Sequence, residues 1–396
     1  MKKCIAIVGT LDSKSEEHLF LKETIESNGC STITIDIGTT GLSKFSPDFS
    51  VSNSILTKDM DRSGMVEAIV EKAKELVYDL YHQGKIGAII SAGGGTGTFM
   101  GTSIMKVLPL GVPKFMVSTV ASRDMSQTIG TKDITIMHSV VDMLGLNSLS
   151  RLVLSRAAGA VCGMMIENNS RENELPRIAL SLFGFITKAA ENIKSILEDN
   201  HFEVIPFHAN GTGGMAMDEM MEESFFQGVL DLATHELVDA MFDGYCGGIG
   251  PQRLQSPKGI DIPRLAIPGG LDSAVLEFNH KNVPEKYKDR KIFYYDFRSA
   301  IRLTADESRS LAKTVAYKLN QSYNPIKVLI PLKGWSEADK QGDVLFDAES
   351  SSAFSNTLQT LLKSDIEVIK VDYHINENAF AGIAADLMIR MIHDQC

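Results

Sequence analysis

The first residues whose types could do chemistry form short glycine-containing turns that follow apolar runs. Residues 9–14, GTLDSK, come directly after the first apolar run and directly before a helical pattern. The free amides and the positive dipole at such a helix start attract anions. Thr10, Ser13 and Lys14 are expected to donate hydrogen bonds to a phosphate, with Asp12 in the same turn. The alternative is a plain strand–turn–helix in which Asp12 or Ser13 caps the helix.

A second turn of this kind lies at residues 91–98, SAGGGTGT. Gly93, Gly94 and Gly95 are consecutive, which lets the backbone approach a ligand closely, and Thr96 follows at the start of a helical pattern. The turn matches neither the P-loop pattern GxxxxGK(S/T) nor a complete GxGxxG fingerprint. It is therefore expected to bind phosphate through backbone amides, or else to be a tight turn that permits close helix packing.

A third polar loop, residues 118–124 with the sequence STVASRD, also follows an apolar run. The carboxyl ends of parallel strands share one edge of a sheet, and open α/β sheets bind their ligands at that edge. We therefore expect the three loops to lie together. We therefore add Ser118, Thr119, Val120 and Ala121 to the predicted phosphate-binding site.

Three aspartates could complete such a site. Asp36 ends the second strand pattern, where it is placed either to accept from a ribose hydroxyl or to cap a turn. Asp133 and Asp142 could line the same pocket or hold Mg²⁺ through water. The alternative for both is an ordinary role in turns and helix caps.

The second half contains a fourth glycine-rich turn, residues 208–214 with the sequence HANGTGG. A strand pattern leads into it and a helical pattern leaves it, so it is another predicted anion site. His208 is a candidate general acid or base, and the alternative is a structural histidine beside a loop. The HANGTGG turn and the PGGLD turn at 268–272 together predict a second ligand site, which we expect in the cleft between two domains. The residues assigned to this second site are His208, Gly211, Gly213, Gly214, Gly269 and Gly270.

The cysteines and histidines give no clear metal site. Cys246 stands among glycines and is either a nucleophile or a buried loop thiol, and no histidine partner can be assigned to it from the sequence. No histidine cluster has metal-ligand spacing, so the sequence does not support a structural metal, and the ligands of any other metal are unknown. The five cysteines are scattered without a CxxC pair, which argues against a disulfide framework and fits a cytoplasmic protein.

Strand and helix patterns alternate in both halves of the chain, which predicts mainly parallel sheets flanked by helices. Residues 168–176, NNSRENELP, are polar and closed by proline, so they predict a domain boundary. We expect two Rossmann-like domains, residues 1–172 for the nucleotide and residues 173–396 with the second glycine-rich site. Strands are expected at residues 4–9, 32–37, 86–91, 113–118, 134–137, 177–183, 202–207, 265–267, 292–295, 328–331 and 368–371. Helices are expected at residues 13–28, 61–84, 146–166, 188–200, 215–223 and 378–393.

The composition limits the classes of partner. A chain of 396 residues that is 44% hydrophobic can fill the cores of two domains. Its net charge of −11, without any Lys/Arg-rich run, argues against a nucleic-acid binder held by phosphate contacts. The most apolar segment, residues 146–166, contains two arginines and is not expected to span a membrane.

These motifs, together with TKDITIMHSVVDMLGLN at 131–147 and MAMDEM at 215–220, resemble the Tm-one-like ATP-binding family. That family includes the N-terminal region of a plant tobamovirus-resistance protein and its bacterial relatives. The resemblance runs through essentially the whole chain and implies two Rossmann-like domains, ATP binding in the first, and a homodimer. It implies a nucleotide among the GTLDSK turn, Asp36, the turn at 93–96 and the loop from Ser118. The plant protein carries a further C-terminal barrel domain, so a viral partner is not carried over.

The turns and the resemblance together predict an ATP-binding protein, with Mg²⁺ accompanying the nucleotide and an unknown small molecule as second ligand. Whether it is an enzyme stays open. One alternative is an NAD(P)-dependent oxidoreductase, which the fold class and Asp36 permit but the incomplete GxGxxG disfavours. The other is a non-catalytic dimer in which the nucleotide regulates binding to another protein.

Overall fold

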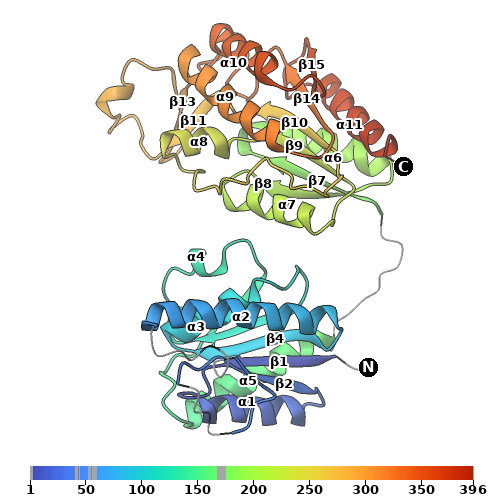
Figure 1. The fold of residues 1–396 in the computed structure, drawn as a ribbon. Coiled ribbons are helices and arrows are strands. Elements are labelled where there is room, and N and C mark those ends of the chain that lie inside the picture. The colour runs from blue at the N-terminus through green and yellow to red at the C-terminus, as the bar shows by residue number, and fades with distance from the viewer. Residues whose placement is uncertain are drawn as a thin grey trace. The chain divides into compact units, whose positions relative to one another are not determined.

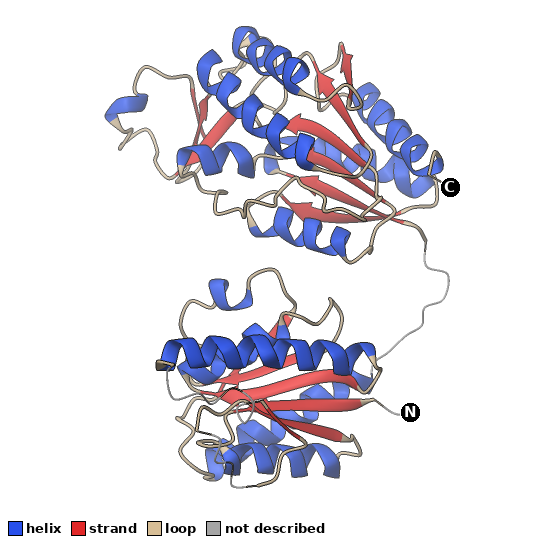
Figure 2. Cartoon of the chain, viewed as in Figure 1, coloured by secondary structure: helices blue, strands red, loops and turns tan. Residues whose placement is uncertain are grey.

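The computed structural model describes residues 3–40, 43, 45–51, 55, 60–166 and 175–395. The chain divides into two compact units, Met1–Glu172 and Asn173–Cys396. Residues 168–174 of the predicted boundary lie outside the described residues. Each unit is a layered α/β domain with helices on both faces of a sheet, as Figures 1 and 2 show. The expected fold class, two Rossmann-like domains, is confirmed.

The N-terminal domain is built on a six-stranded sheet in the order β3-β2-β1-β4-β5-β6, with every pair parallel. This is the strand order of dinucleotide-binding Rossmann sheets, and it reverses between β1 and β4. The strands are β1 Cys4–Gly9, β2 Thr32–Asp36, β3 Phe49–Ser50, β4 Ile86–Gly93, β5 Lys114–Ser118 and β6 Ile134–His138. The helices are α1 Ser15–Ser27, α2 Arg62–His82, α3 Gly95–Met105, α4 Ser126–Ile129 and α5 Ser148–Ile166.

The apolar side chains of β1 explain how this sheet is buried on both faces. Ile5 and Ile7 pack with α1 and α5 in one core cluster. Ala6 and Val8 pack with α2 and α3 in another. Successive strand residues face opposite sides of a sheet, so an uninterrupted apolar run places β1 at the centre of a two-sided core.

The C-terminal domain contains a second six-stranded parallel sheet, in the order β15-β14-β10-β9-β7-β8. Its order reverses between β7 and β9. The strands are β7 Arg177–Leu182, β8 Glu203–His208, β9 Gly228–Ala233, β10 Arg264–Gly269, β14 Ile326–Pro331 and β15 Glu367–Val371. The helices are α6 Thr187–Asp199, α7 Thr212–Glu222, α8 Glu236–Phe242, α9 Ala305–Gln321, α10 Ala348–Leu361 and α11 Asn378–His393, with short 3₁₀ helices at Gly184–Ile186 and Glu285–Tyr287.

A small antiparallel sheet stands beside the parallel one in this domain. Its order is β11-β13-β12, and its strands are β11 Ser273–Leu276, β12 Ile292–Tyr294 and β13 Ser299–Arg302. The strand expected at residues 292–295 therefore belongs to this sheet. Because β11 and β13 are only four residues each, their patterns are too short to stand out in the sequence.

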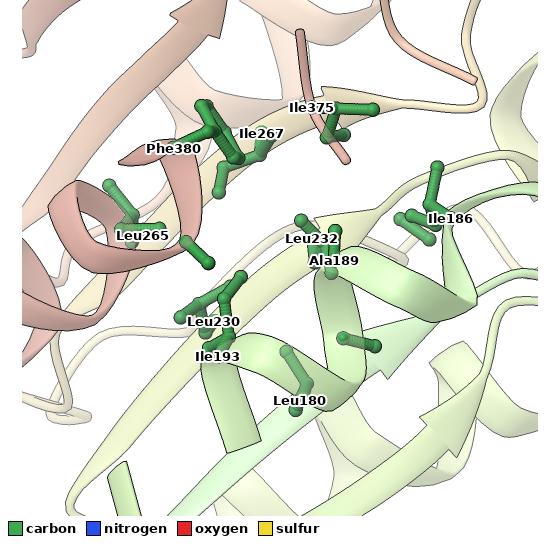
Figure 3. Close-up of a cluster of buried hydrophobic side chains, with 14 of the residues drawn as sticks. Leu180, Ile186, Ala189, Ile193, Leu230, Leu232, Leu265, Ile267, Ile375 and Phe380 are labelled. Atoms are coloured by element: carbon green, nitrogen blue, oxygen red, sulfur yellow. The ribbon is translucent and has the colours of Figure 1, made fainter. Parts of the chain in front are cut away.

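The largest hydrophobic cluster fills the space between the C-terminal sheet and the helices α6 and α11. Figure 3 shows Leu180 and Leu230 from neighbouring strands beside Ile193 of α6. All three side chains are at most 1% exposed. This cluster holds β7 and β9 together at the place where the strand order reverses.

A buried network of charged groups lies at the other face of this sheet. Arg253 donates to Asp231 at 2.6 Å, to Glu236 at 3.0 Å and to Asp218 at 3.2 Å. Arg264 donates to Asp218 at 2.7 Å and also to Asp231. Burial raises the pKa of Glu236, against the lowering effect of Arg253. Each carboxyl group of this interior network has a guanidinium partner, as a buried charge requires.

Several helix starts follow side-chain capping rules. Asp61 accepts from Gly64 N at 2.8 Å and begins α2, in agreement with the helix expected from residue 61. Thr304 and Glu307 form a reciprocal capping box at the start of α9. In the described parts of the chain, no helix combines the length and the apolar character needed to cross a membrane.

Truncating Ile193 to alanine should destabilise the C-terminal domain. The side chain is completely buried, so Ile193→Ala leaves a cavity and should cost about 2–5 kcal/mol of unfolding free energy. Urea unfolding followed through the C-terminal transition measures this loss. The control Leu361→Ala, at an exposed leucine that ends α10, should shift the same transition by at most about 0.5 kcal/mol. Equal losses for the two variants would contradict the packing described above.

Candidate functional site

A pocket of about 560 Å³ opens where the loops after β1 and β4 meet, at the reversal of strand order in the N-terminal sheet. Its lining comes from these loops, from the loop after β2 and from the starts of α2 and α3. The lining residues are Thr10, Asp12, Ser13, Lys14, Thr39, Thr40, Arg62, Gly94, Gly95, Thr96, Gly97 and Met100. Seven of the predicted residues are thus brought together, namely Thr10, Asp12, Ser13, Lys14, Gly94, Gly95 and Thr96.

The GTLDSK turn is held by its own backbone. The amides of Ser13 and Lys14 both donate to the carbonyl of Thr10, at 3.1 and 2.9 Å. The ammonium group of Lys14 donates to the carbonyl of Met143, which lies in the loop after β6. Lys14 therefore joins the first and last loops at this edge of the sheet while it lines the pocket.

Gly9 lets this turn form close to α1. A Cβ atom at Gly9 would lie 2.1 Å from Nε2 of His18, whose ring is fully buried against the end of β1. Nδ1 of His18 lies 2.7 Å from the carbonyl of Lys14. Burial lowers the pKa of His18, so the ring is neutral and acts as packing under the turn.

Two aspartates fix the loop after β2. Asp12 accepts through Oδ2 from the amides of Thr39 and Thr40, at 2.9 and 3.1 Å. Asp36 is 1% exposed and accepts through Oδ1 from the amides of Leu11 and Gly38, at 3.0 and 2.9 Å. Asp12 lines the pocket, whereas Asp36 lies beneath it and organises the backbone around it.

The turn after β4 leaves part of its backbone open. Gly93 packs tightly, because a Cβ there would lie 2.9 Å from Cα of Gly97. At Gly95, by contrast, an added Cβ would meet no described atom within 4 Å. Within the described residues, α3 begins at Gly95 without a side-chain cap. The first residues of this helix line the pocket, and no described side chain caps their amides.

The loop after β5 is tied to this turn. Oγ of Ser118 lies 2.7 Å from Oγ1 of Thr98 and accepts from Val120 N at 3.1 Å. The amide of Thr119 donates to the carbonyl of Gly93 at 3.1 Å. Ala121 continues the same turn and is half-buried. Ser118 and Thr119 therefore hold the Gly93–Thr96 turn in place through their contacts with Thr98 and Gly93.

The other two aspartates of the predicted site lie apart from each other. Asp133 directly precedes β6 and pairs with Nζ of Lys114, the first residue of β5, at 2.6 Å. It therefore lies at the amino-terminal edge of the sheet, away from the pocket. Asp142 is exposed in the loop after β6 and accepts from Met143 N at 2.8 Å.

The structure adds pocket residues that the sequence patterns did not single out. Arg62 is exposed at the start of α2 and supplies a second cation beside Lys14. Thr39 and Thr40 come from the loop after β2, and Met100 from α3. The length and polarity of residues 38–58 were the available signal for this loop.

His208 ends β8 at the carboxyl edge of the second sheet and is exposed. Its pKa is lowered by burial of part of the ring and by the positive charges of His235 and Arg298. The glycines of its turn serve backbone packing: Gly211 has a φ of +94°, and a Cβ at Gly213 would lie 2.1 Å from the carbonyl of His208. Tight backbone turns therefore fix the course of the chain at the carboxyl edge of the C-terminal sheet.

The remaining predicted glycines are packed in the same manner. A Cβ at Gly214 would lie 1.9 Å from Oε1 of Glu236, inside the buried charged network. A Cβ at Gly269 would lie 2.1 Å from the carbonyl of Leu232, and Gly270 has a φ of +74° beside His235. The local packing or the backbone conformation therefore requires glycine at each of these positions.

His235, Asp239 and Cys246 form a buried cluster that the sequence analysis missed. Their potential ligand atoms all lie within 4.8 Å of one another. Burial lowers the pKa of His235, but Asp239 and Cys246 outweigh it and hold that pKa well above its ordinary value. The signal in the sequence was the spacing of a histidine, an aspartate four residues later and Cys246 among glycines.

A further buried cluster sits beyond β10. The guanidinium of Arg302 lies 3.2 Å from Asp339 and 3.8 Å from Asp272, and Asp272 also accepts from Ser336 at 2.8 Å. Two carboxylates here share one buried cation. Burial and the charge of Asp272 raise the pKa of Asp339 from the usual 3.8 to about 7.

Comparison with known proteins places the chain in a family. Residues 3–170 match the model of the Uncharacterised protein family (UPF0261) N-terminal domain, and residues 175–392 match the model of its C-terminal domain. The chain belongs to the UPF0261 family. The expected resemblance to Tm-one-like proteins is confirmed, because a Tm-1 protein is among the relatives of this chain.

Among these relatives, a UPF0261 protein of Clostridium tetani is 37% identical over 99% of this chain and 100% of its own length. The ToMV resistance protein Tm-1(GCR237) of Solanum lycopersicum is 31% identical over 97% of this chain and 55% of its own length. A solved UDP-N-acetylglucosamine 2-epimerase is 11% identical over 67% of this chain and 79% of its own, with a TM-score of 0.25. A likeness this small says nothing about the ligand of a UPF0261 protein.

The raised pKa of Asp339 predicts a specific dependence of stability on pH. The folded chain keeps this proton up to about pH 7, whereas the unfolded chain releases it around the usual value of 3.8. The folded state binds the extra proton, so this group's contribution to stability is lost as the pH rises between these two values. Asp339→Asn, which does not ionise, should flatten that part of the pH profile in urea unfolding of the C-terminal domain. The exposed control Asp365→Asn should leave the profile unchanged, and an unaltered profile in Asp339→Asn would refute the assignment.

Proposed function

We propose that the N-terminal domain binds ATP in the pocket between the loops after β1 and β4. The observation that carries the proposal is the lining itself, in which the starts of α1 and α3 meet beside Lys14 and Arg62. Helix starts offer free amides and a positive dipole, and the two cations add full charge. A chain of phosphates is the ligand chemistry that such a lining suits.

The local charge matters because the whole chain has a net charge of −11. A polyphosphate would be repelled by such a protein unless the site supplies positive charge. Lys14 and Arg62 are the cationic side chains of the described lining, and Asp12 is its acidic one. Mg²⁺ would enter with the nucleotide, held mainly by the phosphate oxygens and by water.

The position of Asp36 favours ATP over NAD(P). In dinucleotide-binding Rossmann domains, an acidic residue of this region accepts from the adenosine ribose. Here the Oδ1 atom of Asp36 already accepts from two backbone amides, and the residue is 1% exposed. Nucleotide recognition by this chain therefore rests on the phosphates, and NAD(P) serves as a competitor in the test.

The remaining expectations belong to the same proposal. The family resemblance supports a cytoplasmic homodimer, with ATP either as substrate or as a regulator of protein binding. A second small-molecule ligand is proposed for the carboxyl edge of the C-terminal sheet, with His208 as its acid or base. His208 suits this role because it is exposed and its lowered pKa leaves the ring neutral at neutral pH.

Removing the cation at Lys14 should weaken ATP binding. A hydrogen bond to a charged group contributes about 1.5–3 kcal/mol, so Lys14→Ala should raise the Kd for MgATP at least about tenfold. Isothermal titration with MgATP measures this. Lys22→Ala, on the helix that begins directly after Lys14 and paired with Glu26 outside the pocket lining, is the matched control and should bind as the unaltered chain does.

The same titration distinguishes the alternatives. No heat with MgATP at millimolar concentration would end the ATP proposal, as would equal affinities of Lys14→Ala and Lys22→Ala. Saturable binding of NAD(P) that ATP does not displace would instead favour the oxidoreductase. Thermal unfolding of both variants checks that loss of the Lys14–Met143 contact has not unfolded the domain.

A further inference from the structure

The cluster of His235, Asp239 and Cys246 lies in the C-terminal domain at the reversal of strand order. His235 comes two residues after β9, and the reversal falls between β9 and β7. In open α/β sheets this is the place where ligands bind. Asp239 lies one helical turn further along α8, so the two side chains share one face. Neither the nucleotide pocket nor the family comparison gives this cluster a role.

Asp239 is fixed in place by backbone amides on both of its oxygens. Oδ1 accepts from Val275 N of β11 at 2.7 Å, and Oδ2 accepts from Cys246 N at 2.8 Å. The turn between them must pass close by, since a Cβ at Gly244 would lie 2.8 Å from Cγ of Asp239. The carboxylate thus sets the position of the loop that carries the thiol.

The hydrogen bond of His235 determines which ring nitrogen faces the cluster. Nδ1 lies 2.8 Å from the carbonyl of Gly270, which can only accept, so Nδ1 carries a proton. Phe183 stacks on the ring at a centroid distance of 3.9 Å and fixes its plane. Nε2 therefore faces Asp239 and Cys246. Metal-binding histidines are oriented in this way, with the second N–H on a backbone carbonyl.

In the part of the chain that the structure describes, Nε2 of His235 lacks the hydrogen-bond partner that a buried polar atom needs. It is fully buried and lies 3.3 Å from Oδ2 of Asp239, yet it makes no hydrogen bond of good geometry with any described residue. A neutral ring would direct its lone pair at a carboxylate oxygen in a low-dielectric interior. A positive charge is needed between these atoms, supplied either by a proton on Nε2 or by a metal cation.

We propose that His235, Asp239 and Cys246 bind a zinc ion. Imidazole nitrogen, carboxylate oxygen and thiolate sulfur are the donors that zinc takes, whereas magnesium and calcium take oxygen alone. One thiolate and one carboxylate neutralise the charge of Zn²⁺, so the occupied site is neutral in the interior. On binding, the proton of the Cys246 thiol passes to solvent and its sulfur bonds the metal.

Three protein ligands leave a fourth position on a tetrahedral ion. Zinc sites that act on substrates have this open position, filled by water or by an oxygen of the substrate. The charges of His235 and Arg298 act on His208, and the charges of Asp239 and Cys246 act on Tyr295, so both residues lie near the cluster.

Metal content of the tag-free chain tests the proposal directly. Protein purified without chelators and dialysed against buffer should carry about one zinc per chain by elemental mass spectrometry, as one set of three ligands implies. After zinc is removed, Co²⁺ should restore binding and give the near-ultraviolet charge-transfer absorption of a cobalt–thiolate bond. Zinc at background level, together with no cobalt absorption at stoichiometric addition, would overturn the proposal and leave a protonated His235 as the source of charge.

A matched pair of cysteine variants locates the metal. Cys246→Ser should abolish the cobalt–thiolate absorption and lower metal affinity at least about tenfold, because a ligand is lost. Cys4→Ser, at a partly buried cysteine of the N-terminal domain, should keep both. Absorption that persists in Cys246→Ser, or disappears in Cys4→Ser, would refute the assignment. If Cys246→Ser does not fold, a variant with Cys4, Cys30, Cys162 and Cys396 all replaced by serine decides: its cobalt–thiolate band should persist, and loss of the band in the folded variant would refute the assignment.

Discussion

Both halves of this chain depend on one geometric constraint, namely that all strands of each main sheet run parallel. A parallel neighbour can be reached only by a crossover, so every strand end delivers its next loop to the same edge. In the N-terminal domain this gathers the loops after β1, β2 and β4 around one pocket. In the C-terminal domain it brings the turn after β9 beside the chain that leaves β7, where Phe183 stacks on His235.

Much of this architecture could be predicted from the sequence, because long strands and helices leave periodic patterns of apolar residues. The helix from Asp61 and the apolar strand β1 were expected nearly as they stand, and the GTLDSK and glycine turns were placed at the right edge. The role of Asp36 could not be predicted, since a strand-end aspartate can face either a ligand or the backbone. Asp133 was grouped with the pocket although the strand expected at residues 134–137 begins directly after it, which places it at the amino-terminal edge of the sheet.

The cluster around His235 was missed for a different reason. Ligand searches along a sequence rely on histidine and cysteine pairs at short spacing, whereas here one histidine, one aspartate and one cysteine are assembled by a helix turn and a glycine loop. The hydrogen bonds that orient them, from Val275 N and to the carbonyl of Gly270, come from distant segments. Only the folded chain brings those segments together.

The buried charges of Arg253, Arg264, Asp218 and Asp231 have a consequence for how this protein can diverge. Replacing one member leaves its partners as uncompensated charges in the interior, whereas replacing the whole set by packed apolar residues can be tolerated. Single steps along a lineage are therefore blocked at these positions. Descendants should inherit the set as a block or lose it together, and Gly214, which leaves room for it, should follow the same pattern.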